Sequence, residues 1–114
     1  MSASRGGAAR QAAPVFAALG DTTRLSLVRR LSAEGPLSIT RLSEGSGMTR
    51  QAITRHLHSL GKVGLVRDNK EGREHVFSLD LKRLEVAREY IDQVSAQWDA
   101  AAARLKAFVE KDEG

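Results

Sequence analysis

The stretch SITRLSEGSGMTRQAITRHLHSL, residues 38–60, decides the fold. Ser38 and Thr49 each precede a run with helical apolar spacing, and a hydroxyl side chain in that place caps a helix by accepting a hydrogen bond from its first turn. The glycines at 45 and 47 mark a tight turn between the two runs, and Gly61 is expected to end the second one. Two short helices joined by a glycine turn predict a helix-turn-helix.

Two further helices precede this stretch. Pro14 suits the first turn of a short helix that Gly20 ends, because the missing proline N–H would be unpaired there anyway. Asp21 is a good cap for the next helix, and Gly35-Pro36 closes it with residues that favour helix termination.

A β-hairpin follows the helix-turn-helix. Residues 65–67 and 75–79 carry the β-branched and aromatic residues typical of strands, and residues 69–72 form a turn signal that ends in glycine. The sequence therefore predicts a mainly α fold with a β-hairpin wing.

A long final helix is expected from the Asp80 cap to about Lys111. Its apolar residues recur at alternating steps of three and four, which is the heptad pattern of a coiled-coil seam. As a helix this segment would span about 45 Å, whereas a domain of this size is only about 26 Å across. The seam therefore predicts a homodimer. Its residues are Leu84, Ala87, Ile91, Val94, Trp98, Ala101, Leu105 and Phe108.

Composition limits the classes of function. The chain has 114 residues and a formal charge of +4, and it lacks cysteine, which excludes disulfides, thiolate metal sites and cysteine nucleophiles. No apolar run approaches the roughly 20 residues of a membrane helix, and residues 1–12 contain no secretion signal, so a cytoplasmic protein is expected. We expect a flexible tail over 1–11, one domain over 12–111 with its dimerisation helix over 81–111, and a short tail over 112–114.

Charge is distributed unevenly along the chain. Residues 1–80 contain 12 Lys and Arg against 7 Asp and Glu, whereas residues 81–114 contain 6 against 7. A basic part joined to a near-neutral part favours a protein that meets a polyanion with one half.

The helix expected over 49–60 carries a polar stripe without acids. Gln51, Thr54, Arg55 and His58 recur at helical spacing, opposite an apolar face. Arg55 suits a bidentate bond to guanine, Gln51 can pair with adenine, and Thr54 offers a hydroxyl and a methyl. Thr49 and Arg50 lie at the helix N-terminus, where phosphate binds well. The stripe predicts a helix that reads double-stranded DNA in the major groove, although any amphipathic helix has a polar face.

The hairpin turn adds a basic tip. Lys70 and Arg73 flank Gly72 and are expected to reach an adjacent groove or the DNA backbone. Glu71 and Glu74 oppose this interpretation, since a charged turn is commonly just solvated.

Three segments resemble the ArsR/SmtB winged-helix repressors. Residues 16–25, FAALGDTTRL, resemble the family's "ALADPTRL" opening, and residues 49–57, TRQAITRHL, resemble its "SQxAVSRHL" recognition helix. Gly64-Leu65-Val66 with Glu71-Gly72-Arg73 resembles its "GLV…EGR" wing. The resemblance covers about residues 12–111 and implies a winged helix-turn-helix fold and DNA binding. It also implies pairing of two subunits through the first and last helices, with Phe16 of the first helix in the interface. Thr22 stands where the family usually has proline.

The metal-ligand sets of that family are missing from this sequence. The third helix lacks cysteine, and no histidine or cysteine occurs from Leu81 onward. His56 and His58 are two residues apart and so point to different helix faces, which prevents them from chelating one ion; His56 is expected to pack in the core, and His75 lies on a strand. The chain therefore resembles the branch without metal ligands, and no cofactor is expected, although an unidentified small-molecule inducer fits this branch.

Other hypotheses for this chain concern ligand binding, catalysis and protein docking. Tyr90 and Trp98 could line a pocket for an organic ligand, but large residues at helical spacing more often form a seam. No Ser, His and Asp grouping indicates an enzyme. We expect a homodimeric, sequence-specific transcriptional repressor that binds an inverted-repeat operator. The alternative is a winged helix that docks a protein partner and does not bind specific DNA.

Overall fold

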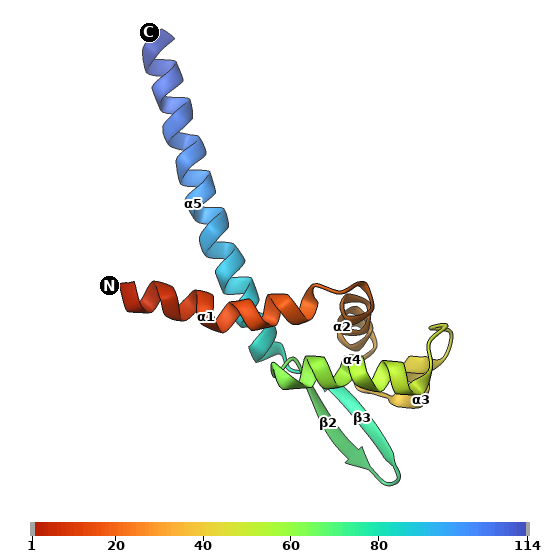
Figure 1. Cartoon of the computed structure of the whole chain (residues 1–114). Helices are drawn as coiled ribbons and strands as arrows, with labels where there is room; N and C mark the ends of the chain where they lie inside the picture. The colour runs from red at the N-terminus through yellow and green to blue at the C-terminus, as the bar shows by residue number, and fades with distance from the viewer. Residues whose placement is uncertain (1, 114) are drawn as a thin grey trace.

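The computed structural model describes the backbone of residues 2–113 and the side chains of residues 7–111. It is elongated, with principal extents of 71 × 33 × 20 Å, because the last helix projects away from the rest of the chain (Figure 1). The elements in chain order are α1 (Ser2–Leu19), α2 (Thr22–Glu34), β1 (Leu37–Ser38), α3 (Ile39–Ser43), α4 (Arg50–Lys62), β2 (Val66–Glu71), β3 (Glu74–Leu79) and α5 (Leu81–Glu113). This is the expected winged helix-turn-helix with a long C-terminal helix.

The caps expected from the sequence are present at α2, α3 and α4. The side chains of Asp21, Ser38 and Thr49 each accept a hydrogen bond from the backbone N–H three residues later. Gly35 follows α2 with φ +82°, and its N–H donates to the carbonyl of Leu31 at 3.1 Å. Local chemistry therefore fixes where these helices begin and where α2 ends.

Helix α4 ends later than the sequence predicted. It continues through Gly61 to Lys62, and the left-handed residue that terminates it is Gly64, with φ +80°. The N–H of Gly64 donates to the carbonyl of Gly61, and the N–H of Leu65 donates to that of Leu60, both at 3.0 Å. This is the bonding pattern of a Schellman motif. Leu60 and Leu65 are both fully buried, so the motif also anchors the helix end in the core.

The sheet has three antiparallel strands in the order β1-β3-β2, where the sequence predicted only a hairpin. The short strand β1 pairs Leu37 with Phe77. The hairpin is also longer than predicted, since Glu71 pairs with Glu74 and only Gly72, at φ +62°, and Arg73 form the turn. The outer part of β2 is exposed on both faces, so its sequence lacks the alternation that marks a half-buried strand.

Helix α1 begins at Ser2, so the predicted start of this helix at Pro14 is wrong. Pro14 lies inside this helix. Five alanines among residues 2–13 have high helix propensity, which explains the longer helix. At the other end, α5 continues to Glu113 and includes residues 112 and 113, which the sequence assigned to a tail. Met1 and Gly114, the outermost residues of the two expected tails, lie outside the described residues.

The core lies where α1, α2, α4 and the base of the wing meet. Its fully buried side chains include Val15 of α1, Leu42 of α3, and Ile53 and Leu57 of α4. Helix α1 crosses the first turns of α5, where the rings of Phe16 and Tyr90 meet edge to face with centroids 6.0 Å apart. Among residues 2–113, no helix has the length and apolar character needed to cross a membrane.

Candidate nucleic-acid interface

The core packing of α4 leaves its polar side exposed. Because Ile53, Leu57 and Leu60 are buried, the opposite side of the helix faces outward. Gln51, Arg55 and His58 are exposed on that side, with Thr54 half-buried beside them. The structure therefore brings the four stripe residues onto one surface.

Two shallow hollows extend along this side of α4. One, of about 490 Å³, is lined by Arg50, Gln51, Thr54 and Arg55 together with Ile39 at the start of α3. The next, of about 350 Å³, is lined by Thr54, Arg55, His58, Ser59 and Lys62. None of the described residues that line these two hollows is acidic, so both accept a polyanion without charge repulsion.

The N-terminal end of α4 is organised by hydroxyl groups. Thr49 Oγ1 accepts a hydrogen bond from the N–H of Ala52 at 3.1 Å. Thr54 Oγ1 donates to the carbonyl of Arg50 at 2.7 Å. Since this bond uses the only hydroxyl proton of Thr54, an outside partner meets an acceptor and a methyl group there. Arg50 is exposed beside the helix N-terminus, where free N–H groups favour an anion.

The wing places its basic residues far from this stripe. Lys70 pairs with His75 near the end of the hairpin, and Arg73 lies in the turn itself. At about 3.4 Å per residue, the turn is about 20 Å from Val66 at the hairpin base, where β2 meets α4. Glu71 and Glu74 stand opposite each other next to the turn, so the tip combines two cations with two anions. Wing and stripe can therefore contact only separate parts of a duplex.

Arg67 and Asp80 close the base of the wing, a pair that the sequence analysis did not identify. Arg67 donates from Nε to Asp80 Oδ2 at 3.0 Å, and its Nη2 lies 2.9 Å from the same oxygen. This hydrogen-bonded guanidinium holds the pKa of Asp80 below its usual range. Asp80 also accepts from the N–H of Lys82 at 3.0 Å, so it joins the wing to the start of α5.

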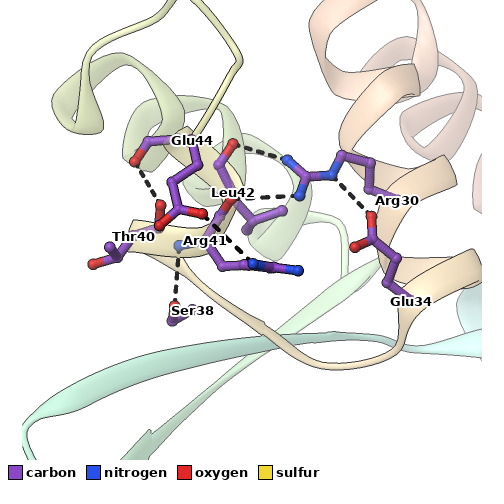
Figure 2. A network of polar contacts seen from close by, with 8 residues as sticks. Arg30, Glu34, Ser38, Thr40, Arg41, Leu42 and Glu44 are labelled. Carbon is purple, nitrogen blue, oxygen red and sulfur yellow. Dashed lines mark hydrogen bonds and ion pairs between the residues drawn. The ribbon is translucent and has the colours of Figure 1, made fainter.

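Arg30 positions the first helix of the helix-turn-helix, as Figure 2 shows. Its Nη1 donates to the carbonyl of Leu42 at 3.1 Å and its Nη2 to that of Arg41 at 3.4 Å, while Nε donates to Glu34 Oε2 at 3.1 Å. The guanidinium of Arg30 thus satisfies carbonyls at the C-terminal end of α3. This helix is too short to supply hydrogen-bond donors for these carbonyls itself. The spacing of Arg30 and Glu34 predicts their ion pair, but nothing in the sequence indicates that Arg30 also binds carbonyls of α3.

Asp21, Arg24 and His56 form a second cluster, which joins α2 to α4. Arg24 Nε donates to the carbonyl of Ala18 at 2.6 Å, and its Nη1 lies 3.4 Å from His56 Nδ1. Asp21 Oδ2 accepts from the backbone N–H of Arg24 and lies 3.7 Å from His56 Nδ1. The backbone hydrogen bond, supported by the nearby Arg24 charge, lowers the pKa of Asp21. His56 is half-buried at the edge of the core and was expected to pack inside it.

The predicted dimer seam divides into two parts in the structure. Leu84 and Ala87 pack in the chain's own core, where Ala87 is buried, and Phe16 is half-buried against Tyr90. Ala87 therefore packs within its own chain, and its place in an intersubunit seam stays a prediction. From residue 91 onward the large apolar residues are exposed, from 46% at Val109 to 72% at Trp98. They include Ile91, Val94, Leu105 and Phe108, whereas Ala101 is half-buried.

The histidines are dispersed among different surroundings. His58 is exposed on the stripe, and His75 Nδ1 lies 2.9 Å from Asp68 Oδ1 on the wing. In the part of the chain that the structure describes, no three His, Asp or Glu residues come close enough together to hold a metal ion.

Comparison with known proteins places these features in context. The family profile described as "Helix-turn-helix domain" matches residues 19–69. The transcriptional regulator NmtR of Mycobacterium tuberculosis is 39% identical over 72 residues, which are 63% of this chain and 59% of that regulator's length. The arsenical resistance operon repressor of Escherichia coli is 30% identical over 95 residues, covering 83% of this chain and 79% of that repressor. An ArsR-like transcriptional regulator from Rhodococcus sp. RHA1 superposes with a TM-score of 0.76 at 32% identity, over 90% of this chain and 95% of that one.

Proposed function

Because this chain belongs to the ArsR family of DNA-binding helix-turn-helix transcriptional regulators, we propose that it is a homodimeric repressor that recognises an inverted-repeat operator. The observation that carries the proposal is the exposed side of α4, where two hollows are lined by polar and basic groups and by no acid.

Base recognition is assigned to the stripe on α4. Arg55 is exposed and carries a donor fork of the shape that guanine O6 and N7 accept, and Gln51, one helical turn earlier, can pair with adenine. Thr54 and His58 lie beside them, within reach of a base edge. Thr49 and Arg50 at the helix N-terminus are assigned to phosphate, and so are Lys70 and Arg73 on the wing.

Dimerisation is assigned to the outer part of α5 from Ile91 to Phe108. Large apolar side chains there are exposed, and their heptad spacing fits knobs-into-holes packing against another helix. The partner is a second copy of this chain, because a twofold axis gives the two recognition helices the symmetry of an inverted repeat.

We propose that metal ions do not regulate this protein. His56, His58 and His75 lie in separate surroundings. Among the described residues, Asp21 is the one carboxylate within 4 Å of His56, and Asp68 is the one within 4 Å of His75. Isothermal titration calorimetry with zinc, cadmium, copper and arsenite should show no site of submicromolar affinity. One tight site per subunit would contradict this assignment and would point to a histidine with additional carboxylates.

A salt titration of binding to random duplex DNA separates this function from the alternative of a protein-docking module. A DNA-binding protein neutralises phosphates and releases counterions, so its affinity should fall steeply and log-linearly as salt rises. A docking module should show weak binding with little dependence on salt. Fluorescence anisotropy with labelled duplex is sufficient, and that second result would reject the proposed function.

A further inference from the structure

A hollow of about 390 Å³ lies where the C-terminal end of α4 meets α1 and α5. Figure 1 shows this end of α4 beside the start of α5, while the tip of the wing lies away from it. Among the described residues, its charged lining consists of Arg10 of α1, Lys62 of α4 and Arg83 of α5, with no acidic side chain. Three cations from three different helices therefore share one concave surface.

These cations lack partners among the described residues. Arg24, Arg30, Arg41, Arg67 and Arg88 each have a hydrogen-bonded or ion-paired partner, whereas no such contact involves the side chains of Arg10, Lys62 or Arg83. Arg83 packs against Gly64, where an added Cβ would lie 3.2 Å from its Nε. The C-terminal end of α4 supplies only about half a negative charge. It can therefore offset about half the charge of one of the three cations, and the remaining positive charge favours an anion from outside the chain.

The hollow continues the polar stripe of α4. Lys62 follows Gln51, Arg55 and His58 at helical spacing, and it also lines the adjoining hollow with Arg55 and His58. A duplex lying along the stripe would carry its backbone past the end of α4. The source of anion that lies in line with this surface is therefore a DNA phosphate.

We propose that Arg10, Lys62 and Arg83 form a phosphate clamp that grips the DNA backbone at the end of the recognition helix opposite the wing tip. This inference rests on the proposed function, because it needs DNA along α4. The guanidinium groups of Arg10 and Arg83 can each donate two hydrogen bonds to phosphate oxygens, and Lys62 adds a point charge. Since α1 and α5 each supply one arginine, the clamp joins the helices assigned to dimerisation directly to the DNA.

The test compares Arg10→Ala, Lys62→Ala, Arg83→Ala and the triple variant with the wild type on operator and random duplexes across salt. Lys106→Ala is the matched control, because Lys106 is exposed far along α5 and has only a 4.0 Å ion pair with Glu110. Each clamp variant should flatten the salt slope by about one unit per half-site. The triple variant should weaken operator and random DNA by the same factor, roughly 10- to 100-fold near physiological salt.

Two further measurements keep the result interpretable. Circular dichroism and light scattering verify folding and dimerisation of each variant, and Arg83→Lys should retain most of the slope because it keeps the charge. In a further experiment, neutral methylphosphonates replace the phosphates that the clamp is expected to contact in each half-site. This change should reduce the affinity of the wild type to that of the triple variant and leave the affinity of the triple variant unchanged.

The outcomes separate the clamp from the proposed function. If the wild type binds its operator with a steep salt slope and the triple variant matches Lys106→Ala, the clamp is wrong while the function stands. If the variants keep the wild-type slope but lose thermal stabilisation by inorganic phosphate, the hollow holds a small free anion and the clamp is again wrong. If the wild type shows no salt-dependent DNA binding, both proposals fail.

Discussion

The helix-turn-helix body and the outer part of α5 have similar apolar side chains in opposite surroundings. In the body, Leu42, Ile53, Leu57 and Leu60 are almost fully buried within one chain. Beyond residue 90, Ile91, Trp98, Leu105 and Phe108 are all more than half exposed. The body therefore buries its own apolar side chains, whereas the outer helix leaves its apolar side chains exposed, as the proposed dimer requires. The predictions below test that division.

Charge reversal on the exposed seam should have the largest effect. The double variant Ile91→Glu and Leu105→Glu places like charges in the proposed interface, which a coiled-coil seam cannot bury. We expect monomers by light scattering and a loss of at least about 100-fold in operator affinity, since a monomer presents one recognition helix. A monomeric wild type at micromolar concentration would contradict the seam assignment.

A pair of matched leucine truncations separates the two regions by their effect on folding. Leu57→Ala removes a side chain that is 1% exposed and should lower the free energy of unfolding by about 2–5 kcal/mol. Leu105→Ala, 65% exposed, should leave the unfolding of the isolated chain nearly unchanged and weaken only dimerisation. Chemical denaturation at several protein concentrations measures both effects. If both variants lowered the free energy of unfolding equally and independently of protein concentration, the proposed difference between the two regions would be contradicted.

Two arginines test the same contrast on the DNA side. Arg55→Ala removes a donor fork on the stripe, and it should cost roughly 1–3 kcal/mol and relax preference at one or two base pairs. Arg73→Ala on the wing should weaken all sequences about equally and flatten the salt dependence by about one unit. Base preference is measured by the binding of both mutant proteins to a set of operators that each differ at one base pair, and salt dependence is measured by repeating the binding across salt concentrations. A change of base preference from Arg73→Ala alone would make the wing the reading element.

The smallest expected effect concerns acid pH. The pKa values of Asp21 and Asp80 are lowered in the fold, by the backbone hydrogen bond from Arg24 and by the side-chain hydrogen bond from Arg67. A carboxyl whose folded pKa is lowered adds stability above the unfolded pKa of about 3.9 and loses it as pH falls through the folded pKa. Thermal melts of Asp21→Asn and Asp80→Asn should depend less on pH than the wild type below about pH 4. An unchanged acid profile would mean that these contacts do not stabilise the fold.

The starts of three helices could be predicted from the sequence, whereas the end of α4 could not. Asp21, Ser38 and Thr49 mark helix starts through side-chain chemistry that acts within three residues, so their positions were predicted correctly. The end of α4 was misplaced because Gly61 and Gly64 look alike in sequence, and only the buried contact of Leu60 with Leu65 favours the second.

Long-range contacts account for most of what sequence patterns missed. Arg30 binds carbonyls of α3 that are eleven or twelve residues away. Every residue has a backbone carbonyl, so the pattern of side chains does not indicate which carbonyls an arginine will bind. Ala87 fits the heptad as well as Ile91 does, yet it is buried in its own chain near the place where α1 packs against α5, and the heptad pattern alone does not indicate this. The cations around the α4 terminus lie in three separate segments, so only the fold brings them together.

Selection of binding sites from a random duplex library tests most directly that two copies of this chain read DNA through α4. The wild type should enrich an inverted repeat whose half-site centres are about one helical turn, 10–10.5 base pairs, or a multiple of it apart. Arg55→Ala should enrich the same repeat with one or two positions relaxed in each half. Enrichment of a single unrepeated site, or of no sequence at all, would contradict the account.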